Sequence, residues 1–99
     1  MPNQTIRIVA LFKARPEQTQ ALKSFLTQLI EPTRQEKGCL RYELHQNTAD
    51  PTDFVFIEEW ENHAAIDRHM QTPHIQAALP HVGDFLVAPP DIRRYQPCE

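Results

Sequence analysis

The stretch CLRYELHQNTADPTDFVFIEEWE, residues 39–61, decides the fold of this 99-residue chain. Apolar and polar residues alternate in its two halves, as in strands that bury one face. Residues 47–52 (NTADPT), between the halves, are rich in residue types that form turns. Residues 39–46 and 53–61 are therefore expected to pair as an antiparallel hairpin.

The alternation gives the second strand of this hairpin two different faces. One face carries rings and a carboxylate: Phe54, Phe56, Glu58 and Trp60. The other carries Val55, Ile57 and Glu59, whose two aliphatic members suit packing against a helix. A hairpin without a bulge would place Tyr42 opposite Glu58 and Leu40 opposite Trp60.

A helical pattern precedes the hairpin. Pro16 suits the first turn of a helix, Pro32 should kink its last turn, and Gly38 can end it. The apolar stripe of this helix has the spacing i, i+3, i+4, i+7, i+8 and consists of Leu22, Phe25, Leu26, Leu29 and Ile30.

A second helical pattern follows the hairpin. Asn62 can cap a helix that runs through Met70. Thr72 and Pro73 can begin the helix again as cap and first residue, and Pro80 would end it.

The two ends of the chain supply the outer strands. Residues 5–13 (TIRIVALFK) predict a strand that is apolar on both faces. Residues 84–88 (DFLVA) predict a fourth strand, which Pro89 and Pro90 interrupt. The double proline suggests that residues 91–95 form an arm that leaves its own sheet.

This order of elements predicts one α+β domain over residues 1–99. Strand, helix, strand, strand, helix, strand is the ferredoxin-like split βαβ arrangement, an antiparallel sheet with both helices on one face. The other face of the sheet would be bare, although the first strand is apolar on both sides. We therefore expect a second copy to cover that face in a homodimer.

Composition excludes several classes of function. A net charge of −3 without a basic stripe argues against a nucleic-acid partner. No apolar run approaches the ~18 residues of a membrane span, and the start of the chain lacks an export signal, so a cytoplasmic setting is expected. Two glycines cannot build a glycine-rich phosphate loop.

Two ionisable residues are candidates for acid–base chemistry. Glu58 among aromatic rings would lose hydration, which raises its pKa and makes it a proton acceptor near neutral pH; a rim position paired with an arginine is the alternative. His69 could take a proton from a phenol if it points inward, and a solvent-facing helix histidine is the alternative. The spacings among His63, His69 and His74 are poor for a metal site on one helical face, so no metal is expected.

Three segments, TRQEKGCLRYELHQN, DFVFIEEWEN and DRHMQTPHI, together resemble the antibiotic biosynthesis monooxygenase family of dimeric α/β barrels. The likeness extends from Ile8 to about Leu79 and includes the closing PDIRRY. The family's pattern falls on Glu36, Gly38, Cys39, Tyr42, Glu58, Trp60, His69, Thr72, Pro73 and His74.

The resemblance implies a reaction as well as a fold. It implies oxygenation of a quinol or related phenol directly by O₂, with no flavin, haem or metal cofactor. His69 or Glu58 would be the base, and Tyr42 would hydrogen-bond the substrate oxygen. The residues that would bind the substrate are Trp60, Phe54, Phe56 and His74.

Departures from related patterns bear on the alternatives. Haem-degrading relatives have a tryptophan at the position of His69 and a histidine at that of Leu79, so haem degradation is not expected. An isomerase of a phosphorylated autoinducer-2 sugar shares Glu58 and His69 but has tyrosine and lysine where this chain has Trp60 and Met70. That isomerase activity and a non-catalytic small-ligand binding or stress-response module remain the alternative functions.

Overall fold

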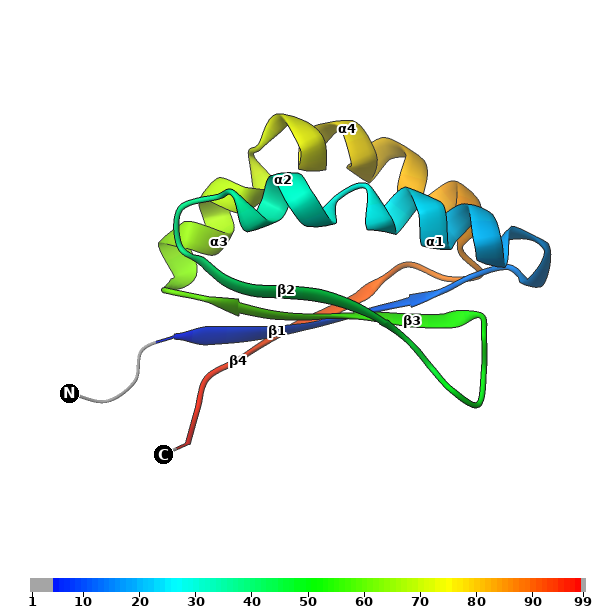
Figure 1. The fold of residues 1–99 in the computed structure, drawn as a ribbon, viewed down its shortest axis with the longest axis horizontal. Coiled ribbons are helices and arrows are strands. Elements are labelled where there is room, and N and C mark those ends of the chain that lie inside the picture. The colour runs from blue at the N-terminus through cyan, green and yellow to red at the C-terminus, as the bar shows by residue number, and fades with distance from the viewer. Residues whose placement is uncertain (1–4, 99) are drawn as a thin grey trace.

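A computed structural model describes residues 5–98 as an antiparallel four-stranded sheet with the helices layered on one face (Figure 1). The strands, in the spatial order β2-β3-β1-β4, are β1 (Ile6–Lys13), β2 (Cys39–Gln46), β3 (Asp53–Trp60) and β4 (Asp91–Tyr95). The α-helices are α1 (Thr19–Thr27), α2 (Ile30–Arg34), α3 (His63–Met70) and α4 (Pro73–Val82), and Pro16–Gln18 and Gly83–Phe85 form short 3₁₀ turns. The expected ferredoxin-like α+β fold is confirmed.

The hairpin forms where the alternation places it, with one change of register. Tyr42 lies opposite Glu58 as expected. Cys39, not Leu40, lies opposite Trp60, because a bulge between Cys39 and Arg41 inserts one extra residue into β2. Leu40 is that residue, and it is 51% exposed.

The two faces of β3 are the reverse of the expected assignment. Phe54 and Phe56 are buried in the core that the helices cover. Val55 and Ile57 are only half-buried and belong to the face without helices. The large rings fill the space between sheet and helices, where burying their area is most favourable.

Pro32 breaks the first helix earlier than expected. The helix divides into α1 and α2 at Gln28 and Leu29 rather than bending at the proline itself. Proline lacks the N–H that would bond to the carbonyl four residues earlier, which is that of Gln28, and its ring crowds that carbonyl.

The second helical pair confirms two cap positions and corrects one end. The side chain of Asn62 accepts a hydrogen bond from the Ala65 N–H at 2.9 Å and caps α3. Pro73 begins α4 after Thr72, which occupies the cap position without a side-chain capping hydrogen bond. The Thr72 hydroxyl donates instead to the His69 carbonyl at 2.7 Å. Pro80 does not end α4, which continues to Val82 around the proline.

The end of the chain differs most from expectation. The predicted strand at residues 84–88 is wrong, since only Leu86 makes an isolated bridge, to Ala14. The fourth strand is β4, which pairs with β1 of the same chain, so residues 91–95 are not an arm that leaves its sheet. Proline interrupts a strand by removing a ladder donor, and pairing resumes after Pro90. No helix among residues 5–98 is long and apolar enough to cross a membrane.

Candidate active site

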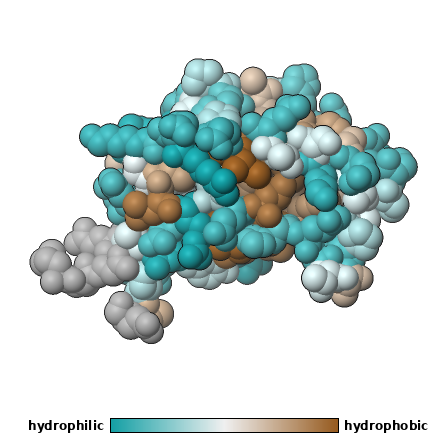
Figure 2. All heavy atoms as spheres, viewed as in Figure 1, coloured by the Kyte–Doolittle hydropathy of each residue, from teal (hydrophilic) through white to brown (hydrophobic). Residues whose placement is uncertain are grey.

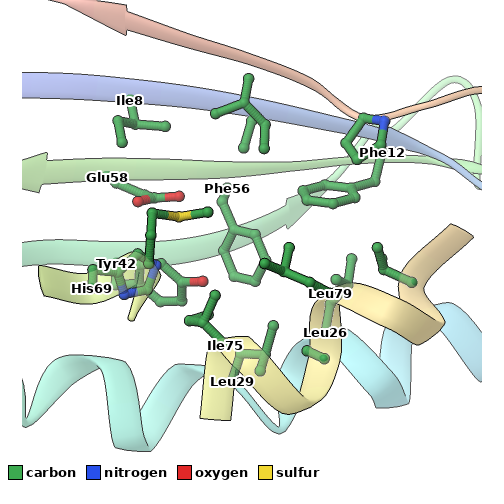
Figure 3. Close-up of a pocket in the computed structure, with 16 residues that line it drawn as sticks. Ile8, Phe12, Leu26, Leu29, Tyr42, Phe56, Glu58, His69, Ile75 and Leu79 are labelled. Atoms are coloured by element: carbon green, nitrogen blue, oxygen red, sulfur yellow. The ribbon is translucent and has the colours of Figure 1, made fainter. Parts of the chain in front are cut away.

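A cavity of about 90 Å³ lies between the sheet and the helices. Most of its lining is aliphatic or aromatic, but Tyr42, Glu58 and His69 contribute polar atoms. These three side chains gather at one end of the cavity, while Phe12 and Leu79 lie at the other (Figure 3). The cavity therefore has a polar end and an apolar end.

Glu58 is a carboxyl group that β3 holds inside the protein, with 5% of its surface exposed. Its Oε1 accepts a hydrogen bond from Trp60 Nε1 at 2.8 Å. Burial raises the pKa of Glu58 to about 7, with a smaller contribution from the charge of Glu36, and the Trp60 hydrogen bond opposes the rise. The carboxyl group can thus gain or lose a proton near neutral pH.

His69 projects from α3 and is 4% exposed. Its Nδ1 lies 2.8 Å from Glu36 Oε2, and its ring lies against Trp60 with ring centroids 4.7 Å apart. Burial lowers the pKa of His69 from its ordinary value, and the contact with Glu36 opposes that shift. Because a carboxylate only accepts hydrogen bonds, Nδ1 carries the hydrogen and Nε2 keeps a lone pair.

Glu36 joins two helices through a single oxygen. It lies in the bend between α2 and β2, and its Oε2 also contacts His74 Nε2 at 2.8 Å. The same nitrogen of His74 lies 3.2 Å from Thr33 Oγ1 and 3.3 Å from Thr72 Oγ1. Glu36 therefore fixes the orientation of His69 on α3 and of His74 on α4.

Sequence reasoning placed Glu36 in the family pattern without giving it a role in the site. A periodic sequence pattern cannot predict which helix a residue in a bend contacts. Only the family pattern therefore indicated the position of Glu36. Thr33 is also fully buried here and was not singled out.

Glu36, His69 and His74 are also the residues that could hold a metal ion. Their candidate ligand atoms all lie within 4.8 Å of one another, and two imidazoles with one carboxylate form a set that binds iron in some oxygenases. Spacing along one helix does not predict this cluster, because His69 and His74 stand on different helices. In the structure the three groups satisfy one another by hydrogen bonding.

Tyr42 lies on β2 beside both ionisable groups. Its ring stacks on Phe56 with centroids 4.5 Å apart and meets the His69 ring edge-on at 5.8 Å. Burial raises the pKa of Tyr42 far above its ordinary value, and the nearby charge of Glu58 adds to this. Tyr42 therefore remains a neutral phenol that can donate a hydrogen bond.

The other residues singled out from the sequence fall into two groups. Phe56 lines the cavity. Trp60 and Phe54 are fully buried and, like His74, are not among the residues that line it. Trp60 lies behind the polar end and contacts Glu58 and His69. His74 contacts Glu36, and its ring centroid lies 6.2 Å from that of His69.

Comparisons with known proteins give the same fold. The solved structure of Rv0793 from Mycobacterium tuberculosis superposes with a TM-score of 0.92 at 29% identity, and the match covers 97% of each chain. "Probable quinol monooxygenase YgiN" of Escherichia coli is 31% identical over 93% of this chain and 97% of its own length. An uncharacterized Synechocystis protein, sll1783, is 31% identical over 95% of this chain, which spans 64% of that relative's length.

A family match accompanies these similarities. Residues 5–80 match the family described as antibiotic biosynthesis monooxygenase. Together with the name of the E. coli relative, this match supports a monooxygenase-like function. The chain belongs to the antibiotic biosynthesis monooxygenase family.

Proposed function

We propose that this protein is a cofactor-independent monooxygenase that uses O₂ to oxidise a quinol or a related phenol. The observation that carries the proposal is the polar end of the cavity, where Glu58, His69 and Tyr42 converge inside an otherwise apolar enclosure. A phenol matches the chemical character of such a site because it is an apolar ring with one ionisable oxygen. The likeness to a relative named as a quinol monooxygenase supports this substrate class.

His69 is the base in this scheme. Its Nδ1 is held by Glu36 at 2.8 Å, which leaves Nε2 to accept the phenolic proton. The imidazolium that forms is stabilised by the adjacent carboxylate, as in other histidine–carboxylate pairs. Burial lowers the pKa of His69, which favours the neutral imidazole that can accept a proton.

Glu58 acts in its protonated form. Oε1 accepts the Trp60 hydrogen bond, so a proton on Oε2 can be donated to the substrate oxygen. An ionised carboxylate would repel a phenolate, whereas a neutral buried carboxylic acid stabilises it. Tyr42 is a neutral phenol at the same end of the cavity and provides a second hydrogen-bond donor there.

The remaining steps belong to the substrate and O₂. The electron-rich phenolate passes one electron to O₂, the two radicals combine at a ring carbon, and the resulting peroxide loses water. One oxygen atom of O₂ becomes a new carbonyl group and the other leaves in water, so a phenol and O₂ give a quinone and water. The protein orients the ring, moves the proton and excludes bulk solvent.

We also propose that the protein works as a cytoplasmic homodimer. The sheet face opposite the helices carries half-buried Val9, Leu11, Val55 and Ile57 on its two central strands. Covering this surface with a second copy would remove apolar area from water and close the sheet side of each subunit.

An oxygen electrode tests the proposed reaction. With a menadiol-like hydroquinone, uptake should exceed the autoxidation background and fall about 10²- to 10⁴-fold in His69→Ala, the usual contribution of a general base. Chelator treatment should leave the rate unchanged. Activity that chelation removes and ferrous ion restores would instead assign the reaction to a metal at Glu36, His69 and His74. Oxygen uptake at the background rate would show that the protein does not catalyse this oxidation.

A further inference from the structure

A second, open groove borders the apolar end of the cavity. Three residues, Leu79, Val82 and Pro90, line both spaces. The groove has a volume of about 410 Å³ and runs between the end of α4 and residues 86–90. The inner cavity and the outer groove are therefore neighbours that share one wall.

Every residue that lines the outer groove is apolar or glycine. Leu79 is 46% exposed and Val87 is 57% exposed, and both belong to the groove. Single exposed apolar residues are common on proteins, but these two lie together in a groove beside a cavity with a polar end, where they could cover the apolar part of a ligand.

The inner cavity is too small to hold a large substrate alone. Its volume of about 90 Å³ is below the roughly 150 Å³ of a protein cavity known to accept benzene, and far below the roughly 300–1,000 Å³ of sites for larger ligands. A ring whose oxygen reaches Glu58 and His69 must therefore extend along the cavity toward Phe12 and Leu79 (Figure 3). A substituent at that end of the ring would lie next to the residues that the cavity and the groove share.

We infer that the substrate is a phenol or hydroquinone that carries a hydrocarbon chain on the side of the ring away from the ionised oxygen, and that this chain lies in the groove of Leu79 and Val87. The inference rests on the proposed function for the position of the ring. The apolar lining predicts a saturated or isoprenoid chain without charge, because a charged chain would find no partner among the groove residues.

The test is calorimetric titration under argon with phenol and 4-hexylphenol. Oxidation cannot occur without O₂, so the titration measures binding alone. Each methylene removed from water contributes up to about fourfold in affinity, and we expect hexylphenol to bind at least tenfold more tightly than phenol. Val87→Asn and Leu79→Gln should each reduce that ratio at least threefold. Leu40→Asn is the matched control, since Leu40 is 51% exposed and lies outside the groove.

Equal affinities for the two phenols, or a ratio that the groove variants leave unchanged, would overturn the inference. Light scattering on Val87→Asn provides a second check. If this variant forms a smaller particle than the wild type, the groove is a contact surface for a second copy of the chain, and the inference is overturned. A binding preference for hexylphenol without O₂ uptake would reject only the proposed reaction. Uptake without that preference would reject only the groove.

Discussion

Glu58 is a buried carboxyl group whose ionisation is coupled to folding. Burial raises its pKa from 4.5 to about 7, so the folded state holds the proton more tightly than the unfolded state does. Its contribution to the free energy of unfolding is therefore complete below about pH 4.5 and is lost as pH rises to about 7. The loss amounts to about 3 kcal/mol.

Glu58→Gln should remove this part of the pH dependence. The amide oxygen can still accept from Trp60, and the amide does not ionise. Urea unfolding from pH 4 to pH 8 should show the variant gaining about 3 kcal/mol relative to the wild type as pH rises. Glu17→Gln, at an exposed position, is the control and should follow the wild type. A constant difference between Glu58→Gln and wild type would show that the Glu58 pKa is not raised.

The same substitution separates the two candidate bases. If Glu58 donates as an acid, kcat/KM should fall as pH rises through about 7, and Glu58→Gln should retain activity through its amide N–H but lose that descending limb. If Glu58 is the base, the rate should rise through the same pH and the glutamine variant should be inactive. Rates corrected for autoxidation between pH 5 and pH 9 distinguish these outcomes.

Glu36 is a positioning residue for His69. The hydrogen bond and the charge of Glu36 both hold the pKa of His69 up against the effect of burial, so Glu36→Gln should lower that pKa further. It should also reduce kcat by about 10- to 100-fold with little change in KM, because the imidazolium loses its partner. NMR titration of the His69 ring checks the first effect independently of turnover. Glu31→Gln, on the exposed side of α2, should change neither quantity, and an unshifted His69 in Glu36→Gln would exclude the pairing.

The connection between α2 and β2 depends on the backbone conformation of a single residue. Gly38 has a φ of +90°, and a Cβ built there would lie 2.7 Å from the Ala65 Cβ on α3. The same glycine accepts a hydrogen bond from the Glu61 N–H at 2.9 Å through its carbonyl. Close packing of this turn on α3 is what brings Glu36 to His69.

Gly38→Ala should destabilise the protein by about 2–4 kcal/mol, the sum of a strained φ and a steric conflict. Ala65→Gly should lose about 1 kcal/mol by itself, because glycine is a poor helix former. In the double variant the conflict is relieved. Its destabilisation should therefore be at least about 1 kcal/mol smaller than the sum of the two single-variant losses. Thermal unfolding of the four proteins measures this coupling, and strict additivity would mean that the two residues do not contact.

Periodic elements were the part of the structure that the sequence predicted well. Alternation in residues 39–61 placed both strands of the hairpin, and the capping Asn62 placed the start of α3. Proline was the main source of error, because its effect depends on surroundings that sequence does not contain. The exposed Pro80 is tolerated inside α4, and the pair Pro89 and Pro90 precedes the last strand rather than following it.

Sequence patterns predicted which side chains of one strand or helix share a face, but not which elements bring their side chains together in the candidate site. Alternation on β3 identified Glu58, and the helix suggested His69, but neither pattern could bring Glu36 to His69 or Thr33 to His74. Those contacts depend on how three separate segments pack. The expected packing of Val55 and Ile57 against the helices was wrong for a related reason. Both faces of β3 contain apolar residues, so only the packed structure decides which face the helices cover.

At the scale of the whole molecule, the sheet is the largest feature without a partner. Figure 1 shows that the helices cover one face only, and Figure 2 shows apolar surface in a hollow between the helical layer and the sheet. A chain of this size buries only about 60–65% of its unfolded surface, so association would add substantially to its stability.

Ile57→Lys tests the proposed dimer. Light scattering of the wild type should give about twice the 11.5 kDa of one chain. Lysine at the centre of the bare face should give a monomer, because an unpaired charge would otherwise be buried in the interface. Ala77→Lys, on the exposed side of α4, should remain dimeric. A wild type that is monomeric at micromolar concentration would contradict the assembly.

The most direct test of the account is the fate of isotopically labelled oxygen. Chelator-treated protein should convert a hydroquinone under ¹⁸O₂ into a quinone with one additional ¹⁸O atom, whereas H₂¹⁸O with unlabelled O₂ should add none when the product is analysed before exchange. The labelled product should fall to background in His69→Ala. A product free of ¹⁸O, or one formed equally by wild type and His69→Ala, would contradict direct oxygenation at the polar end of the cavity.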